Sequence, residues 1–302
     1  MNKLHCDLGK LILKNPVTVA SGTFGSGKEF KDFYDLSQLG GIMVKGTTLL
    51  PRKGNMPQRL VETAGGLINS IGLANGGVDD FLNNILPEAK DYGTAIIVNI
   101  SGDTTDDYGR MAEKLSVPGV AALEVNISCP NVKHGGIAFG TVPDMAREVT
   151  AMVKNNTDLP VIMKLSPNVT NIAEMGAAVE SGGADIISMI NTLIGMAIDI
   201  KNRKPIIKNI MGGYSGPPIK PVALRMVYQV YKTVKIPIIG MGGIMNTEDA
   251  LEFIMAGASA VSVGTANFVD PYTPLNIIKG LNKYVEENGL SSYKEIIGAV
   301  HR

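Results

Sequence analysis

The stretch IPIIGMGGIMNTEDALEFIMAGASAVSVGT, residues 236 to 265, contains the pattern that decides the fold. It begins with an apolar, β-branched run, continues into a longer amphipathic stretch, and ends in a second short apolar run. Glu248 and Asp249 follow Thr247 at the start of the middle stretch, and acidic residues there are typical of the first turn of a helix. A strand, a helix and a second strand in this order form a unit of a parallel sheet.

The same alternation extends along the whole chain. Longer amphipathic stretches separate the apolar runs, and one example is the helix predicted over residues 79 to 93. Eight parallel strands with helices between them close into a barrel, so we predict an α/β fold of the (β/α)8 or TIM-barrel type. The eight predicted strands are residues 16 to 20, 42 to 46, 95 to 100, 120 to 126, 161 to 166, 185 to 190, 236 to 242 and 260 to 264.

Three segments exceed what a minimal barrel needs. Residues 4 to 16 place Gly9 between two apolar runs, which predicts an N-terminal β-hairpin at the barrel floor. The connections over residues 47 to 77, after the second strand, and 192 to 219, after the sixth, are long, and long insertions in compact domains usually carry function. We predict one domain over residues 1 to 302, because a single α/β barrel commonly has this length.

Composition argues against several classes of protein. The 28 basic and 28 acidic residues balance, aromatic residues make up 5%, and Trp is absent, so the patterns of a nucleic-acid binder are missing. The two cysteines, Cys6 and Cys129, and an N-terminus without the apolar core of a signal peptide argue against a disulfide-built secreted protein. No stretch approaches the roughly 18 apolar residues of a membrane span. We expect a cytosolic protein without a metal site.

Polar residues and glycines gather where the predicted strands end, which is the face on which barrel enzymes carry their chemistry. A buried polar group without a partner costs about 1 to 3 kcal/mol, so we expect a ligand rich in donors and acceptors. Glycine pairs after the last two strands are typical of a phosphate site, although glycines also make tight turns. The residues at these strand ends are Ser21, Lys45, Gly46, Asn99, Asn126, Lys164, Asn191, Thr192, Gly242, Gly243, Gly264 and Thr265.

Several motifs resemble the dihydroorotate dehydrogenase family, and they span nearly the whole chain. They are NSIGLAN (69 to 75), NISCPN (126 to 131), the lysines of IMVKG and VIMKLS, INT (190 to 192) and GMGGI (240 to 244). The resemblance implies an FMN-dependent (β/α)8 barrel that oxidises dihydroorotate to orotate in pyrimidine biosynthesis. The cysteine in NISCPN resembles the class 1 enzymes of the family, because the membrane-associated class has serine there.

The segment VKHGGIAFGT, residues 132 to 141, resembles the subclass that passes electrons to NAD. The resemblance implies a partner subunit with FAD and a [2Fe-2S] cluster, in a heterotetramer of two catalytic and two electron-transfer chains around a homodimer core. Two cysteines cannot ligate such a cluster in this chain itself. Two alternatives stay open: another dehydrogenase on the same frame, such as a fumarate-dependent homodimer or a dihydrouracil-type enzyme, and a non-catalytic barrel that binds phosphate ligands.

Cys129 is the predicted catalytic base. Oxidation of dihydroorotate removes a ring proton beside a carbonyl and a hydride from the neighbouring carbon, so a base is needed opposite the flavin. A thiol with a pKa of about 8.5 can serve if Lys133 or His134 lowers that pKa, and the loop around it can close over substrate. A lone cysteine is otherwise often an inert buried residue, and this is our interpretation of Cys6. His134 itself is expected to be solvated or substrate-gating.

The resemblance implies the remaining roles. Lys164 would place positive charge beside the N1 and C2-carbonyl end of the flavin and Lys45 would bridge flavin and substrate, unless an ion pair with Glu124 gives a lysine a structural role. Asn69 alone, and Gly216 in SGPP, could instead be turn residues. The predicted substrate ligands are Lys45, Asn69, Ser70, Ile71, Gly72, Leu73, Asn126, Asn191 and Thr192, and the predicted FMN ligands are Ser21, Lys45, Gly46, Asn99, Asn126, Lys164, Ile190, Gly216, Gly242, Gly243, Gly264 and Thr265.

Overall fold

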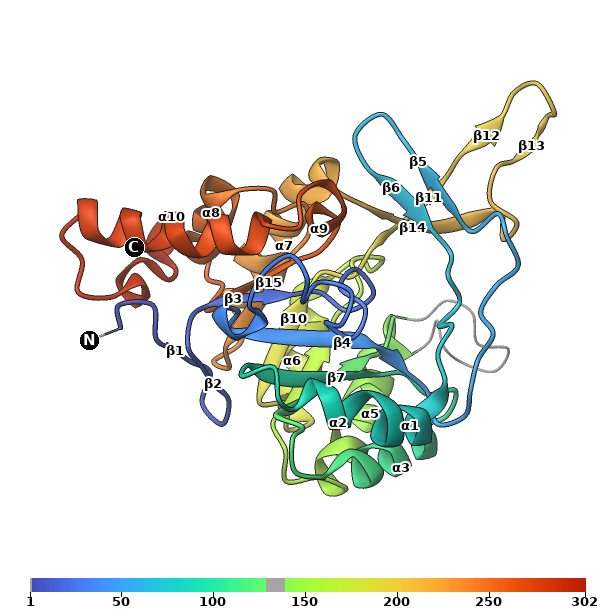
Figure 1. Ribbon diagram of the computed structural model, residues 1–302, viewed down its shortest axis with the longest axis horizontal. Coiled ribbons are helices and arrows are strands. Elements are labelled where there is room, and N and C mark those ends of the chain that lie inside the picture. The colour runs from blue at the N-terminus through green and yellow to red at the C-terminus, as the bar shows by residue number, and fades with distance from the viewer. Residues whose placement is uncertain (1, 129–138) are drawn as a thin grey trace.

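A closed barrel of eight parallel strands forms the centre of the molecule, and helices surround it (Figure 1). The structure is a computed structural model that describes residues 2 to 128 and 139 to 302. Neighbouring strands follow one another in chain order, so the predicted (β/α)8 fold is confirmed, and each predicted strand end lies within two residues of the observed one. The barrel strands are β3 (Val17–Val19), β4 (Gly41–Thr47), β7 (Ala95–Ile100), β8 (Ala122–Asn126), β9 (Val161–Lys164), β10 (Ile186–Met189), β15 (Ile238–Met241) and β16 (Ala260–Val263).

The helices lie outside the barrel, as the alternating pattern predicted. The acidic first turn predicted after Thr247 is present, and Asn246 caps that helix by accepting the Asp249 N–H. No helix in the described part of the chain is long and apolar enough to cross a membrane. The helical segments are α1 (Gly77–Asp80), η2 (Phe81–Ile85), α2 (Leu86–Ala89), α3 (Thr105–Leu115), α5 (Pro143–Asn155), α6 (Ile172–Ser181), α7 (Lys220–Tyr231), α8 (Thr247–Met255), α9 (Ala266–Val269) and α10 (Thr273–Glu287), with short turns η1 (Leu36–Gln38), η3 (Pro217–Ile219), η4 (Tyr293–Ile296) and η5 (Ala299–His301).

The two long insertions meet in one four-stranded antiparallel sheet of order β11-β14-β6-β5. Strand β14 of the second insertion pairs with β6 of the first, and Gly213 lies opposite Asn69 in that register. A small hairpin, β12 and β13, protrudes beyond the sheet (Figure 1). The sequence predicted both insertions but not their pairing. The strands outside the barrel are β1 (Cys6–Asp7), β2 (Ile12–Leu13), β5 (Leu60–Glu62), β6 (Leu67–Asn69), β11 (Leu193–Met196), β12 (Ile198–Asp199), β13 (Lys204–Pro205) and β14 (Met211–Ser215).

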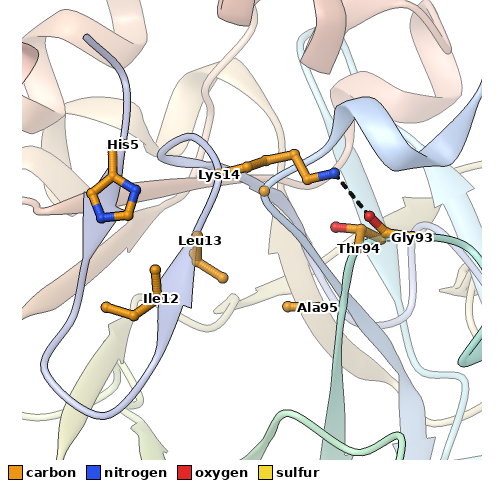
Figure 2. Close-up of a pocket in the computed structure, with 8 residues that line it drawn as sticks. His5, Ile12, Leu13, Lys14, Gly93, Thr94 and Ala95 are labelled. Atoms are coloured by element: carbon orange, nitrogen blue, oxygen red, sulfur yellow. Dashed lines mark hydrogen bonds between the residues drawn. The ribbon is translucent and has the colours of Figure 1, made fainter. Parts of the chain in front are cut away.

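The N-terminal hairpin, β1 and β2, lies against the N-terminal ends of the barrel strands. Gly9 forms its turn with a φ of +80°. The Cys6 thiol donates to the carbonyl of Ser259, which directly precedes β16. Figure 2 shows Lys14, whose ammonium donates to the carbonyl of Gly93 at 2.8 Å, just before β7. The pocket in that view therefore belongs to the barrel floor, and the predicted floor hairpin is confirmed.

Candidate active site

Three glycine-containing segments meet at the ends of β14, β15 and β16. Gly216 has a φ of +106°, and a Cβ there would lie 2.9 Å from the Cα of Gly66. A Cβ on Gly243, with a φ of +80°, would lie 2.9 Å from the Gly216 carbonyl oxygen. The Thr265 hydroxyl donates to Ser215 Oγ at 2.9 Å. Left-handed φ and close backbone approach both exclude side chains. Gly243 and Thr265, from the pairs predicted to hold a phosphate, therefore lie beside Gly216 and Gly66, and we call these residues the glycine cluster.

The other predicted cofactor residues adjoin this glycine cluster. A Cβ on Gly242 would lie 3.3 Å from Cγ1 of Ile190, which follows β10. A Cβ on Gly264 would lie 3.8 Å from Cβ of Ala20, the neighbour of Ser21 after β3. The sites after β3, β10, β15 and β16 therefore face the same part of the barrel rim.

A network of acidic and basic side chains supports the glycine cluster. The buried Asp249 carboxylate accepts the Met245 N–H at 2.8 Å and the Lys220 ammonium at 2.6 Å, and Lys220 also pairs with Glu252 at 2.9 Å. Burial alone would lower the pKa of Lys220, but its hydrogen bonds to Asp249 and Glu252 outweigh burial and raise that pKa above its usual value. These bonds join α7 and α8 to the loop that contains Gly243.

A second group of residues, the asparagine cluster, lies at the ends of β8 and β10. Asn126 Oδ1 accepts the amide of Asn191 at 3.2 Å and the N–H of Ser128 at 3.1 Å. Asn191 Oδ1 in turn accepts the N–H of Thr192 at 2.8 Å. Cys129, the predicted base, directly follows Ser128 in the chain but lies outside the described residues, together with Lys133 and His134 of the same loop.

The insertion sheet brings Asn69 to the asparagine cluster. Its amide donates to the carbonyl of Gly213 at 3.3 Å, across the β6 and β14 pair. A Cβ on Gly213 would overlap the Thr192 side chain, so Thr192 lies directly against this glycine. Residues from the first insertion, from the second insertion and from the end of β10 thus meet at one place.

The predicted substrate loop, residues 70 to 73, contacts the predicted cofactor residues. Gly72 and Leu73 have φ values of +74° and +54°, and the left-handed conformation at Leu73 is uncommon for a residue other than glycine. A Cβ on Gly46 would lie 3.0 Å from Asn99 Oδ1 and 3.3 Å from Cδ2 of Leu73. The loop therefore adjoins β4 at Gly46, which also lies beside Asn99 of β7. Ile71 lies between Ser70 and Gly72 within the loop.

The two predicted lysines differ in their surroundings. Lys45 is exposed, and its ammonium has no ion-pair partner within residues 2 to 128 and 139 to 302. Lys164 is 6% exposed and pairs with Glu124 at 3.4 Å, so the structural ion pair that the sequence left as an alternative does form for this lysine. Glu124 also accepts the amide of Asn99 at 2.6 Å and the hydroxyl of Ser188 at 2.7 Å.

Sequence reasoning considered Glu124 only as an ion-pair partner of a lysine and assigned no role to Ser188. A signal for Glu124 existed, because an acidic residue stands two positions before Asn126 in an otherwise apolar strand and so points to the same face. Asn99, Asn126 and Lys164, for which a polar ligand is expected, also bond to other residues of the site.

Two serines of the site keep unused hydrogen-bonding capacity. The hydroxyl oxygens of Ser70 and Ser128 are buried, and neither has a partner in the described part of the chain. Buried polar groups normally have partners, so these hydroxyls fit contact with a polar ligand. The glycine cluster likewise fits a phosphate, since two close backbone approaches there leave no room for side chains. The residues present are therefore compatible with FMN beside a polar ring. The role of each predicted residue stays a prediction.

A barrel with a glycine cluster and an asparagine cluster on its C-terminal face defines an enzyme scaffold for a phosphorylated cofactor and a small polar substrate. The family model described as "Dihydroorotate dehydrogenase" matches residues 3 to 285. Two curated relatives named "Dihydroorotate dehydrogenase B (NAD(+)), catalytic subunit" are similar over almost their full lengths. That of Desulforamulus reducens is 62% identical over 299 residues, or 99% of this chain and 98% of the relative. That of Geotalea uraniireducens is 55% identical over 298 residues, or 98% of each.

The chain therefore belongs to the dihydroorotate dehydrogenase family of oxidoreductases, as its motifs predicted. A third relative with the same name, from Parabacteroides distasonis, is 54% identical over 301 residues and 99% of each chain. The names of all three describe NAD-linked catalytic subunits.

Proposed function

We propose that this chain is the FMN-dependent catalytic subunit that oxidises dihydroorotate to orotate in pyrimidine biosynthesis. The observation that carries the proposal is the proximity of the two predicted ligand sets: Gly46 of the cofactor set lies beside Leu73 of the substrate loop and beside Asn99, a second member of the cofactor set. A substrate held by residues 70 to 73 would then lie against a cofactor held at the barrel rim. Membership of the family supports the same conclusion.

The asparagine cluster binds the substrate ring. Asn69, Asn126 and Asn191 offer amide donors and acceptors that match the alternating N–H and C=O edge of a pyrimidine. Thr192 adds a hydroxyl, and the backbone N–H groups of Gly72 and Leu73 bind the substrate carboxylate. Lys45, exposed and without an ion-pair partner in the described residues, has an ammonium available for both ligands.

The glycine cluster would hold the phosphate of FMN, and Lys164 would lie beside its ring system. When bound, FMN supplies the hydride acceptor for the reaction. Lys164 contributes positive charge, and Asn99 and Asn126 contribute amide groups. Ser21, Ile190 and Gly46 line the rest of the cofactor site.

Cys129 removes the proton. Its thiolate accepts the ring proton beside the carbonyl while a hydride leaves the neighbouring carbon, so the substrate loses one proton and one hydride and gains a C=C bond. Ser128, whose N–H donates to Asn126, places the chain next to the substrate ring directly before Cys129.

A partner subunit takes the electrons to NAD. The curated relatives are named as catalytic subunits of NAD-linked enzymes, and this chain has two cysteines, too few to ligate a cluster alone. We infer that the partner contains FAD and a [2Fe-2S] cluster, and that two copies of each chain assemble around a homodimer of catalytic subunits. A cytosolic location and a single domain over residues 1 to 302 are part of the same proposal.

The role of Cys129 is tested by comparing Cys129→Ala with Cys6→Ala as a matched control. Dihydroorotate oxidation is followed with a dye as electron acceptor, so that no partner is needed. Loss of a general base typically costs about 10²- to 10⁴-fold, so Cys129→Ala should retain FMN and lose at least about 100-fold in rate. Cys6→Ala, at the barrel floor, should keep the wild-type rate. Wild-type activity of Cys129→Ala would show that Cys129 is not the catalytic base.

The electron acceptor is tested separately. The purified chain should reduce neither NAD nor fumarate at an appreciable rate when it is supplied with dihydroorotate alone. Rapid fumarate reduction would favour the self-contained homodimeric alternative and contradict the proposed partner subunit.

A further inference from the structure

The barrel interior contains a buried pair of opposite charges, and the proposed binding of FMN and substrate gives no role to its acidic member. Among the described residues, the buried charged side chains are Glu124, Lys164 and Asp249. Asp249 supports the loop of the glycine cluster, whereas Glu124 and Lys164 face each other across β8 and β9. The desolvation of a buried carboxylate is costly, so a fully buried Glu124 requires compensation by its partners.

Three strands supply those partners. Glu124 Oε2 accepts from Asn99 of β7 at 2.6 Å and from Lys164 of β9 at 3.4 Å, and Oε1 accepts from Ser188 of β10 at 2.7 Å. Ser188 and Lys164 are also register partners in the barrel. All three side chains donate hydrogen bonds to the carboxylate, so strands on both sides of β8 hold Glu124 in place. Glu124 in turn holds the Lys164 ammonium in place.

We propose that Glu124 is a positioning residue, whose carboxylate orients the Lys164 ammonium toward the proposed cofactor site and balances its charge. The inference rests on the proposed function, in which Lys164 lies beside the flavin ring. Lys164 and Glu124 together contribute no net charge to that end of the site. Removal of the carboxylate alone would leave the positive charge uncompensated, and removal of the ammonium alone would leave the negative charge.

The charges can be changed with little change in shape. In Glu124→Gln the amide oxygen can still accept from Asn99 and Lys164, and the amide nitrogen can donate to the Ser188 hydroxyl, which is able to accept. Lys164→Met removes the ammonium and keeps most of the side-chain volume. The double variant carries no unpaired buried charge, so it should fold even if a single variant does not.

The test is the midpoint potential of the bound FMN, measured by anaerobic titration of the purified chain. Reduction adds negative charge to the flavin, so positive charge nearby makes reduction easier. Glu124→Gln should shift the potential upward, Lys164→Met should shift it downward, and the double variant should lie between the two. Ser262→Ala is the matched control, because Ser262 is a fully buried barrel serine that bonds to Met43 and not to Glu124. It should leave the potential unchanged.

The outcomes separate the possible failures. If Glu124→Gln lowers the melting temperature but leaves the potential at the wild-type value, Glu124 is only structural and the inference is wrong. If Glu124→Gln does not fold, a double variant with the same potential as Lys164→Met overturns the inference. If the wild-type chain does not bind FMN at all, the proposed function fails, and the inference with it.

Discussion

Gly243 shows how a single residue limits which substitutions the proposed phosphate site tolerates. Its φ of +80° is one that side chains rarely adopt, and a Cβ there would lie 2.9 Å from the Gly216 carbonyl oxygen and from the backbone of Lys220. Gly9 has the same φ of +80° at the barrel floor, but a Cβ there would meet nothing within 4 Å. A comparison of Gly243 with Gly9 therefore separates the free-energy cost of the left-handed backbone conformation from the cost of the close contact with neighbouring atoms.

We therefore predict different results for Gly243→Ala and Gly9→Ala. Gly9→Ala should lose about 1 kcal/mol of unfolding free energy, because the left-handed conformation disfavours a Cβ, and Gly243→Ala should lose more because of its close contacts. Only Gly243→Ala should also weaken FMN binding, by about tenfold or more, since its loop must move. FMN titrations and thermal melts of both variants measure the two effects. Equal FMN affinity in the two variants would contradict the assignment of the glycine cluster.

Cys6 is a buried thiol that makes stability depend on pH. Burial raises the pKa of Cys6 from 9.0 to about 11, and a hydrogen bond with Tyr293 offsets only part of that rise. Between these pH values the unfolded chain releases the thiol proton while the folded chain keeps it. The contribution of the protonated thiol is therefore complete below pH 9 and is lost as the pH rises toward 11.

Urea unfolding at pH 8 and pH 10 of wild type and Cys6→Ala tests this effect. The advantage of the wild type over Cys6→Ala should be smaller at pH 10 by about 1.4 kcal/mol, since pH 10 lies one unit above the unfolded pKa. An advantage that is the same at both pH values would show that the Cys6 thiol does not titrate in this way.

Among the elements, the pairing of β6 with β14 assembles the proposed substrate site. Each strand comes from a different insertion, and their register places Gly213 opposite Asn69. The absence of a side chain at Gly213 leaves the space that Thr192 occupies. Neither insertion alone would bring Asn69 to the end of β10.

Gly213→Ala should displace the Thr192 side chain from its position beside β14. Gly195→Ala on the neighbouring β11 is the control. A Cβ on Gly195 would lie 3.2 Å from Cβ of Tyr214, which is a tight contact but lies outside the asparagine cluster. We expect Gly213→Ala to raise the KM for dihydroorotate by about tenfold, the equivalent of one lost hydrogen bond, with FMN binding unchanged. Steady-state kinetics of both variants provide the comparison. A wild-type KM in Gly213→Ala would show that Thr192 and Asn69 do not bind the substrate.

The sequence predicted the elements with local signals and missed those that depend on distant contacts. The eight barrel strands are short β-branched runs, and the hairpin has Gly9 between two apolar runs, so each was predicted correctly. The pairing of β6 with β14 has no local signal, because its partners lie in different insertions. The same reason hid the network of Glu124, whose hydrogen bonds reach Asn99 on β7 and Ser188 on β10.

At the scale of the whole molecule, the two ends of the barrel differ. The floor is covered by the N-terminal hairpin, while the sheet of the two insertions stands on the opposite side, with β12 and β13 protruding from it (Figure 1). Apolar side chains are exposed on this sheet and hairpin, and Met196 of β11 pairs with Met211 of β14. Exposed apolar patches commonly mark protein interfaces, which supports the proposed homodimer. The residues of this patch are Ile194, Met196, Ile198, Ile200, Ile210 and Met211.

A charge in this patch should weaken assembly. Ile198, 59% exposed, and Val300, 55% exposed near the C-terminus, are matched in exposure but lie on different parts of the molecule. We expect Ile198→Asp to shift the chain from dimer toward monomer in sedimentation velocity, because an aspartate would be buried without a partner. Val300→Asp should remain dimeric. A dimeric Ile198→Asp chain would place the interface elsewhere.

The proposed function requires that this chain bind FMN and use it to oxidise dihydroorotate. The most direct measurement is the visible absorption spectrum of the purified chain, taken anaerobically before and after addition of dihydroorotate. Oxidised flavin absorbs near roughly 450 nm, and transfer of a hydride removes this band. We expect a flavin band that bleaches when dihydroorotate is added, without any partner subunit. A chain that cannot be loaded with FMN, or a flavin band that does not respond to dihydroorotate, would contradict it.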